Sequence, residues 1–150
     1  MPSGFERSLS EENIKAYFEI IRTSQTGTLN EMLHPEFVEC SVEEKTLTLC
    51  FPVASWETNP EGNLHGGILS SMFDFTMGLL SCFVNAGPMT PTVSMNVNFL
   101  SAPSHGDNIC VKAVCAKPGR TLCYTTASAW GSSDSTRLIG TAEGIYFRQK

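Results

Sequence analysis

One carboxylate stands alone in the longest apolar stretch of the chain. Asp74 is the only charged residue in the stretch 68–84, and a buried carboxylate is normally paired or functional because its desolvation is costly. Gly66 and Gly67 come just before this stretch. Without a Cβ, they leave the unpaired N–H groups of a helix N-terminus open to a small oxygen atom. Such N–H groups stabilise the oxyanion that develops on a carbonyl during acyl transfer.

Together these residues indicate acyl transfer to water. Asp74 would act as a general base or as a nucleophile. Asn59, in the polar loop before the glycines, could add a side-chain donor to the oxyanion. The alternative is that Asp74 only hydrogen-bonds a loop. His65 is equally open, since it could take part in catalysis or hold the loop by a hydrogen bond.

The stretch 68–84 has the composition of a helix that is buried on most sides. Apolar residues fall on nearly every face, and Asn85 with Gly87 and Pro88 predicts its end. The length approaches that of a membrane span. However, Asp74 and several hydroxyl residues would be unfavourable in lipid, and no Lys or Arg flanks the stretch as an anchor. We therefore expect a core helix.

The rest of the chain predicts an antiparallel sheet around this helix. Ser8 or Ser10 can cap a first helix that ends near 24–27, and a short helical piece is expected at 29–33. Segments rich in Val, Thr, Ile and aromatic residues then predict strands. These segments are 37–42, 46–53, 92–100, 108–117, 121–130 and 137–147. The short breaks favour a hairpin followed by a meander. We expect one α+β domain over 1–150, with a helical segment at 1–35 and a curved sheet wrapped around the long helix.

Composition and charge limit the function. The net charge is −5 without a basic stripe, which argues against nucleic acid as a partner. Residues 1–7 lack a signal-peptide core, which predicts an intracellular protein, cytoplasmic or mitochondrial. The six cysteines form no Cys-x-x-Cys pair, so we expect reduced thiols and no zinc site. His34 and His105 are expected in surface loops, and no Gly-x-Ser-x-Gly elbow supports a serine hydrolase.

The central motif resembles that of the hotdog-fold acyl-CoA thioesterases. It reads Asn-x-x-Gly-x-x-His-Gly-Gly, with an Asp nine residues after the His. The residues are Asn59, Gly62, His65, Gly66, Gly67 and Asp74. The similarity continues through 92–96, 99–103 and 119–122, and the chain looks closest to the phenylacetate-pathway and "thioesterase superfamily member 2" group.

The resemblance implies the hotdog fold, acyl-CoA as the substrate, and no cofactor or metal. It also implies a homodimer, often paired into a tetramer, with an active site at each dimer interface. Gly66 would give its N–H to the thioester oxygen, and Asn59 would assist. Asp74 of the opposite subunit would activate water, which Thr92 would orient, although a close relative group has Ser there. His65 would hold the loop or contact the substrate.

Contacts with the rest of the substrate can be assigned in part. The phosphates of coenzyme A need cations or backbone donors, for which Arg120 is the first candidate and Lys117 the second. Thr121 and Gly67 complete the expected substrate contacts. The acyl group would meet apolar helix residues that could equally be plain core: Met72, Phe73, Phe75, Met77 and Phe83. The alternative functions are a non-catalytic acyl-CoA or lipid binding protein of the same fold and a purely structural oligomer.

Overall fold

The computed structural model describes residues 8–86, 90–104 and 106–149. The predicted helices and strands are confirmed, and a short 3₁₀ helix, η1, was not predicted. In chain order the elements are α1 (Glu11–Ser24), α2 (Leu29–Met32), β1 (Glu36–Ser41), β2 (Thr46–Pro52), η1 (Ser55–Glu57), α3 (Gly66–Val84), β3 (Thr92–Phe99), β4 (Asn108–Pro118), β5 (Leu122–Gly131) and β6 (Asp134–Phe147).

The strands form one antiparallel sheet in the order β1-β2-β4-β5-β6-β3. The expected hairpin is β1–β2, but a continuous meander of the last four strands is wrong. β3 lies at the edge beside β6, and β4 pairs with β2 instead. Segment 100–107 can make this crossing because eight residues reach about 26 Å when extended, whereas three strand spacings are about 14 Å.

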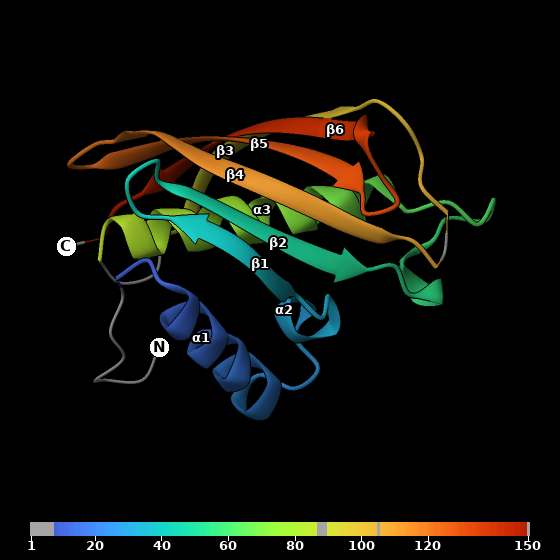
Figure 1. Cartoon of the computed structure of the whole chain (residues 1–150), viewed down its shortest axis with the longest axis horizontal. Helices are drawn as coiled ribbons and strands as arrows, with labels where there is room; N and C mark the ends of the chain where they lie inside the picture. The colour runs from blue at the N-terminus through green and yellow to red at the C-terminus, as the bar shows by residue number, and fades with distance from the viewer. Residues whose placement is uncertain (1–7, 87–89, 105, 150) are drawn as a thin grey trace.

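The long apolar stretch is a core helix, as predicted. α3 runs along the concave face of the sheet (Figure 1), and it is long and apolar enough by composition to cross a membrane. Yet 11 of its 19 residues are buried in the fold. Asn85 caps its C-terminus as expected, while Gly87 and Pro88 lie outside the described residues. This is the architecture of the hotdog fold.

The N-terminal helices pack beside α3. Ser10 caps α1, accepting a hydrogen bond from the Asn13 N–H. The apolar face of α1 then meets α3 through two aromatic pairs: Tyr17 with Phe83, and Phe18 with Phe75, with ring centroids 6.4 and 6.2 Å apart. α1 and α2 therefore stand over the side of α3 that the sheet leaves uncovered (Figure 1).

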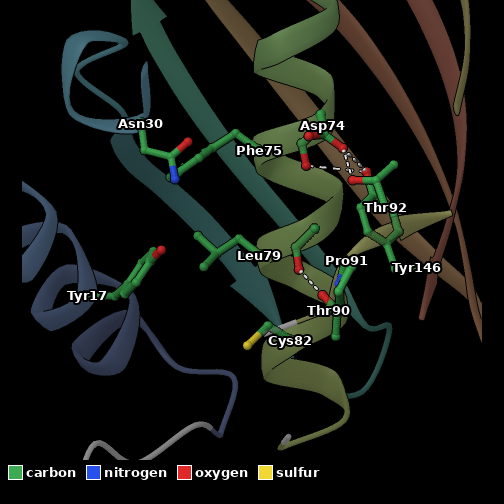
Figure 2. A pocket seen from close by; sticks show the side chains of 11 residues that line it. Tyr17, Asn30, Asp74, Phe75, Leu79, Cys82, Thr90, Pro91, Thr92 and Tyr146 are labelled. Atoms are coloured by element: carbon green, nitrogen blue, oxygen red, sulfur yellow. Dashed lines mark hydrogen bonds between the residues drawn. The ribbon is translucent and has the colours of Figure 1, made fainter. Parts of the chain in front are cut away.

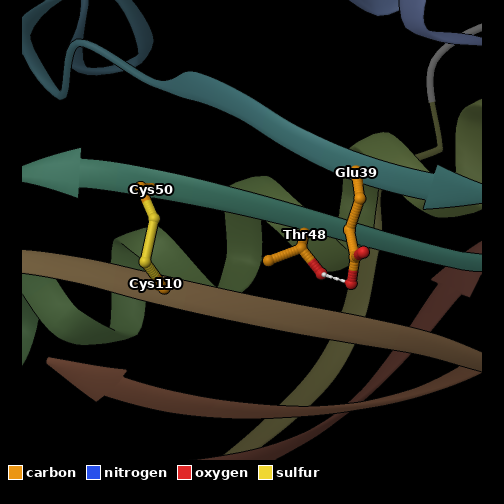
Figure 3. Close-up of a disulfide and its surroundings, with 4 residues drawn as sticks. All are labelled: Glu39, Thr48, Cys50 and Cys110. Atoms are coloured by element: carbon orange, nitrogen blue, oxygen red, sulfur yellow. Dashed lines mark hydrogen bonds between the residues drawn. A yellow bond between two sulfur atoms is a disulfide. The ribbon is translucent and has the colours of Figure 1, made fainter. Parts of the chain in front are cut away.

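The expectation of six reduced cysteines is wrong at one pair. Cys50 on β2 and Cys110 on β4 are direct partners in the strand register, with Cα atoms 4.1 Å apart, and they form a disulfide. Figure 3 shows the bond joining the two strands, near the hydrogen bond from Thr48 to Glu39. The 60-residue separation hid this pairing, because only the register brings the thiols together. The other four cysteines form no disulfide among the described residues, and the thiols of Cys115 and Cys123 lie 3.4 Å apart, at hydrogen-bond distance.

Candidate active site

The N-terminus of α3 presents one unpaired backbone donor. His65 is the N-cap, and its Nδ1 accepts the Gly67 N–H at 2.9 Å. The Ile68 N–H donates to the His65 carbonyl. The Gly66 N–H has no acceptor among the described residues, and the first turn carries no acidic side chain. The partial positive charge of the helix end is therefore available at Gly66.

The loop before α3 is held by the side chain of Asn59. Its Oδ1 accepts the N–H groups of Glu61 and Asn63, at 3.0 and 3.1 Å. Gly62 closes the same turn with a φ of +80°, which favours glycine. The Asn59 Nδ2 donates to none of the described residues, so the amide keeps a free donor while its oxygen orders the loop.

A cleft opens at the Gly66 end of the helix. We call it the Phe99 cleft; it has a volume of about 320 Å³ and is lined by Leu64, Gly66, Leu69, Phe99, Leu100, Ser101, Ala102 and Pro103. Phe99 stands against Gly66, since a Cβ at Gly66 would lie 3.2 Å from the ring. The ring is itself 56% exposed. The absence of a Cβ at Gly66 therefore lets the Phe99 ring approach the helix end closely.

Asp74 sits in a hydrogen-bonded cluster halfway along α3. Two hydroxyls donate to the same carboxylate oxygen, Oδ1: Thr92 at 2.7 Å and Tyr146 at 3.0 Å. Figure 2 shows both side chains pointing at Asp74 from β3 and β6. The other oxygen, Oδ2, has no hydrogen-bond partner among the described residues. The carboxylate thus has one oxygen fixed and one free.

Two clefts adjoin this carboxylate. The Tyr17 cleft, of about 210 Å³, runs from Asp74 along α3 past Leu79 to Cys82. The Ser70 cleft, of about 240 Å³, extends from Asp74 toward the N-terminal half of α3 and includes Ser70, Ser71 and Met95. Asn30 of α2 lines both clefts, and Figure 2 shows it across from Asp74. Asp74 is therefore accessible from solvent on a helix that is otherwise mostly buried.

Sequence reasoning missed three residues of this site. Tyr146 follows Asp74 by 72 positions and belongs to an ordinary strand pattern. Tyr17 and Asn30 lie in helices that gave no functional motif. Only the packing of α1, α2 and β6 around α3 reveals them, and no local signal in the sequence marks them.

The two halves of the predicted site are separated within one chain. Gly66 and Asp74 are eight residues apart on the same helix, which corresponds to about 12 Å along its axis. Catalytic groups must lie within about 3 Å of the reacting atoms. A single chain therefore does not bring the Gly66 N–H and the Asp74 carboxylate to one thioester.

The expected substrate contacts fall in different places. Lys117, Arg120 and Thr121 are exposed at the β4–β5 turn, where the Arg148 N–H bonds the Thr121 carbonyl while the Arg148 side chain bonds the Asn85 carbonyl. This turn is thus at the opposite end of α3 from Gly66. Among the expected acyl contacts, only Phe75 lines a cleft beside Asp74. The others are buried core residues: Met72, Phe73, Met77 and Phe83.

Comparison with known proteins decides the family. A family model described as "Thioesterase superfamily" matches residues 61–137, which is 77 of the 150 residues. The chain belongs to this superfamily. Within it, the human acyl-coenzyme A thioesterase 13 is 37% identical over 71 residues, covering 46% of this chain and 49% of the human protein. The mouse protein of that name is 28% identical over 116 residues, 69% of this chain and 83% of its own. The first curated relatives are thus matched over about half their length.

Solved structures of this superfamily share the fold. Zebrafish thioesterase superfamily member 2 superposes with a TM-score of 0.81 at 22% identity, covering 95% of this chain and all of the zebrafish chain. A hypothetical thioesterase from Streptococcus pneumoniae, solved with coenzyme A, gives 0.69 at 23% identity over 77% of this chain and 89% of that one. At such identities the likeness establishes the hotdog fold that the sequence predicted.

Proposed function

We propose that this protein is an acyl-CoA thioesterase that hydrolyses acyl-CoA to the free acid and coenzyme A. The observation that carries the proposal is the state of Asp74. One of its oxygens is fixed by two hydroxyls and the other is free at the junction of two clefts. A carboxylate held in this way suits a general base that takes a proton from water.

The chemistry needs both halves of the site. The thioester oxygen accepts the Gly66 N–H, with the Asn59 Nδ2 as a second donor, so the negative charge that develops there is stabilised. Asp74 Oδ2 removes a proton from water as the water oxygen attacks the carbonyl carbon. The tetrahedral intermediate then expels the coenzyme A thiolate, which takes the proton from the Asp74 carboxyl. The same atoms would also permit a covalent anhydride at Asp74 that water later cleaves.

Pairing of two β3 strands would assemble these halves. β3 is an edge strand whose Val93 and Phe99 are more than half exposed, and an exposed apolar edge is a template for strand pairing. In an antiparallel pair about a two-fold axis, the start of one β3 lies beside the end of the other. Thr92 at the start bonds Asp74, while Phe99 at the end contacts Gly66.

A homodimer of this kind would therefore contain two composite sites, each with Asp74 from one chain and Gly66 from the other. This arrangement resolves the 12 Å separation of the two groups within a chain. Pairing of such dimers into a tetramer is a further part of the proposal, as is an intracellular location. The phosphates of coenzyme A would reach Arg120, with Lys117 and Thr121 as additional contacts. Gly67 stays a proposed substrate contact at the other end of α3, but not as a donor, because its N–H is bonded to His65 Nδ1. A relative from Streptococcus pneumoniae crystallised with coenzyme A supports this choice of substrate.

The experiment is a thiol-release assay with short, long and aromatic acyl-CoAs on the purified protein. Wild-type protein should release coenzyme A, and Asp74→Asn should lose about 10²–10⁴-fold in kcat because the amide does not take up the proton. Glu44→Gln, in the exposed β1–β2 turn, is the matched control and should behave as wild type. Binding of acyl-CoA without turnover by the wild type would support a non-catalytic binding protein instead. Full activity in Asp74→Asn would refute the role of the carboxylate.

A further inference from the structure

We propose that Tyr146 is a positioning residue for Asp74: its hydroxyl holds Oδ1, together with that of Thr92, so that Oδ2 alone acts as the base. This inference rests on the proposed function, because it assigns the atom that would take the proton from water. Tyr146 itself is 1% exposed and is one of the largest fully buried side chains. Tyr146 belongs to the wall of the Tyr17 cleft, but so little of its surface is exposed that it acts through Asp74 rather than by binding the substrate.

The hydrogen bonds determine which oxygen is free. Thr92 donates to Oδ1 at 2.7 Å and Tyr146 at 3.0 Å, and the Tyr146 hydroxyl also lies 3.3 Å from the Asp74 carbonyl. Two donors on one oxygen fix the plane of the carboxylate. A carboxylate with both oxygens free would instead rotate between orientations. A fixed base is favourable because catalysis depends on a narrow range of orientations.

Tyr146 is protonated and can only serve as a donor to the carboxylate. Burial, and then the negative charge of Asp74, raise the pKa of its hydroxyl well above the ordinary value of 10.0. The hydroxyl therefore keeps its proton at any pH at which a thioesterase would be assayed.

Two glycines form a slot for this ring. A Cβ at Gly78 of α3 would lie 3.2 Å from Cε1 of Tyr146, and a Cβ at Gly144 of β6 would lie 2.7 Å from Cε2. Cε1 and Cε2 lie on either side of the ring carbon that bears the hydroxyl, so the two glycines contact the end of the ring that bonds Asp74. Neither position has a positive φ, hence the fit of the ring, rather than backbone conformation, is what requires glycine there.

A buried tyrosine needs a hydrogen-bond partner for its own stability, and this structural role makes a different prediction. If the bond to Asp74 only met the hydroxyl's own need for a hydrogen-bond partner, removing the hydroxyl would change the stability of the fold. Turnover per folded molecule would then be unchanged. If it positions Asp74, its removal lowers kcat while KM is unchanged, because the substrate does not touch it. The value of kcat per folded molecule, measured together with KM, therefore separates the two roles.

The test compares Tyr146→Phe with Tyr124→Phe in the thiol-release assay, with stability followed by thermal unfolding. Tyr124 lies on β5 with 41% of its surface exposed, and its substitution should leave kcat and KM at wild-type values. Tyr146→Phe should lower kcat by about 10- to 100-fold at constant KM, as expected for loss of a hydrogen bond to a charged group.

Gly78→Ala provides a second variant that retains both hydroxyls. Alanine is the better helix former, so the fold should not weaken, while its Cβ displaces the ring by a few tenths of an ångström. We expect a several-fold lower kcat at constant KM. Wild-type kcat in both Tyr146→Phe and Gly78→Ala would overturn the positioning role, as would a loss of activity that only follows a loss of folded protein. Asp74→Asn distinguishes a failure of the Tyr146 role from a failure of the proposed base. If Asp74→Asn is inactive while Tyr146→Phe and Gly78→Ala are fully active, only the role of Tyr146 is wrong. If Asp74→Asn retains activity, the role of Asp74 as the base is refuted.

Discussion

The disulfide between Cys50 and Cys110 should contribute measurably to stability. It joins β2 to β4 and closes a loop with a sequence separation of 60 residues. The chain-entropy relation gives about 4 kcal/mol for a loop of this length. For a chain of 150 residues, this corresponds to a fall of about 8–16 °C in the unfolding temperature when the bond is absent.

Thermal unfolding with and without a reductant measures this effect directly. Reduced wild-type protein and the double variant Cys50→Ala/Cys110→Ala should both unfold at the lower temperature, and the variant should not respond to reductant. Cys40→Ser is the control, since Cys40 is a free thiol on β1 and its loss should leave the response to reductant intact. An unfolding temperature of wild type that is identical in oxidant and reductant would refute the reasoning.

Two further predictions concern the site. His65→Ala should cost about 1 kcal/mol of stability, measured by urea unfolding, through the lost N-cap bond to Gly67. Its kcat in the thiol-release assay should stay within a few-fold of wild type. A fall in kcat of about 10²-fold or more at unchanged stability would instead make His65 catalytic. Arg120→Gln should raise KM for acyl-CoA at constant kcat, yet leave hydrolysis of a phosphate-free acyl-pantetheine unchanged. Arg137→Gln on β6 is its control, and equal effects on both substrates would argue against a phosphate contact.

Local patterns predicted the elements well because each pattern has a direct local cause. The apolar residues of α3 fill the concave face of the sheet, and the alternation of buried and more exposed residues in β5 follows the two faces of the sheet. The motif also located Gly66 at an unpaired helix N-terminus and Asp74 on the same helix. These are properties of neighbouring residues, which is why the sequence alone was sufficient.

What the sequence did not reveal depends on contacts between distant segments. Tyr146 bonds Asp74, and Asn30 lines the clefts beside it, only because β6 and α2 lie next to α3. Cys50 meets Cys110 only through the register of β2 with β4. The place of β3 at the sheet edge likewise follows from its pairing with β6, which no local periodicity encodes. His105, expected in a surface loop, lies outside the described residues.

The central claim is that Asp74 of one chain and Gly66 of another form each active site, and mixing two inactive variants tests it most directly. Asp74→Asn and Gly66→Val would be purified separately, unfolded and refolded together. Random pairing makes half of the dimers mixed, and each mixed dimer has one intact composite site, so the mixture should recover about a quarter of wild-type activity. If both groups acted within one chain, every site would carry a lesion, and a mixture as inactive as its two components would contradict the account.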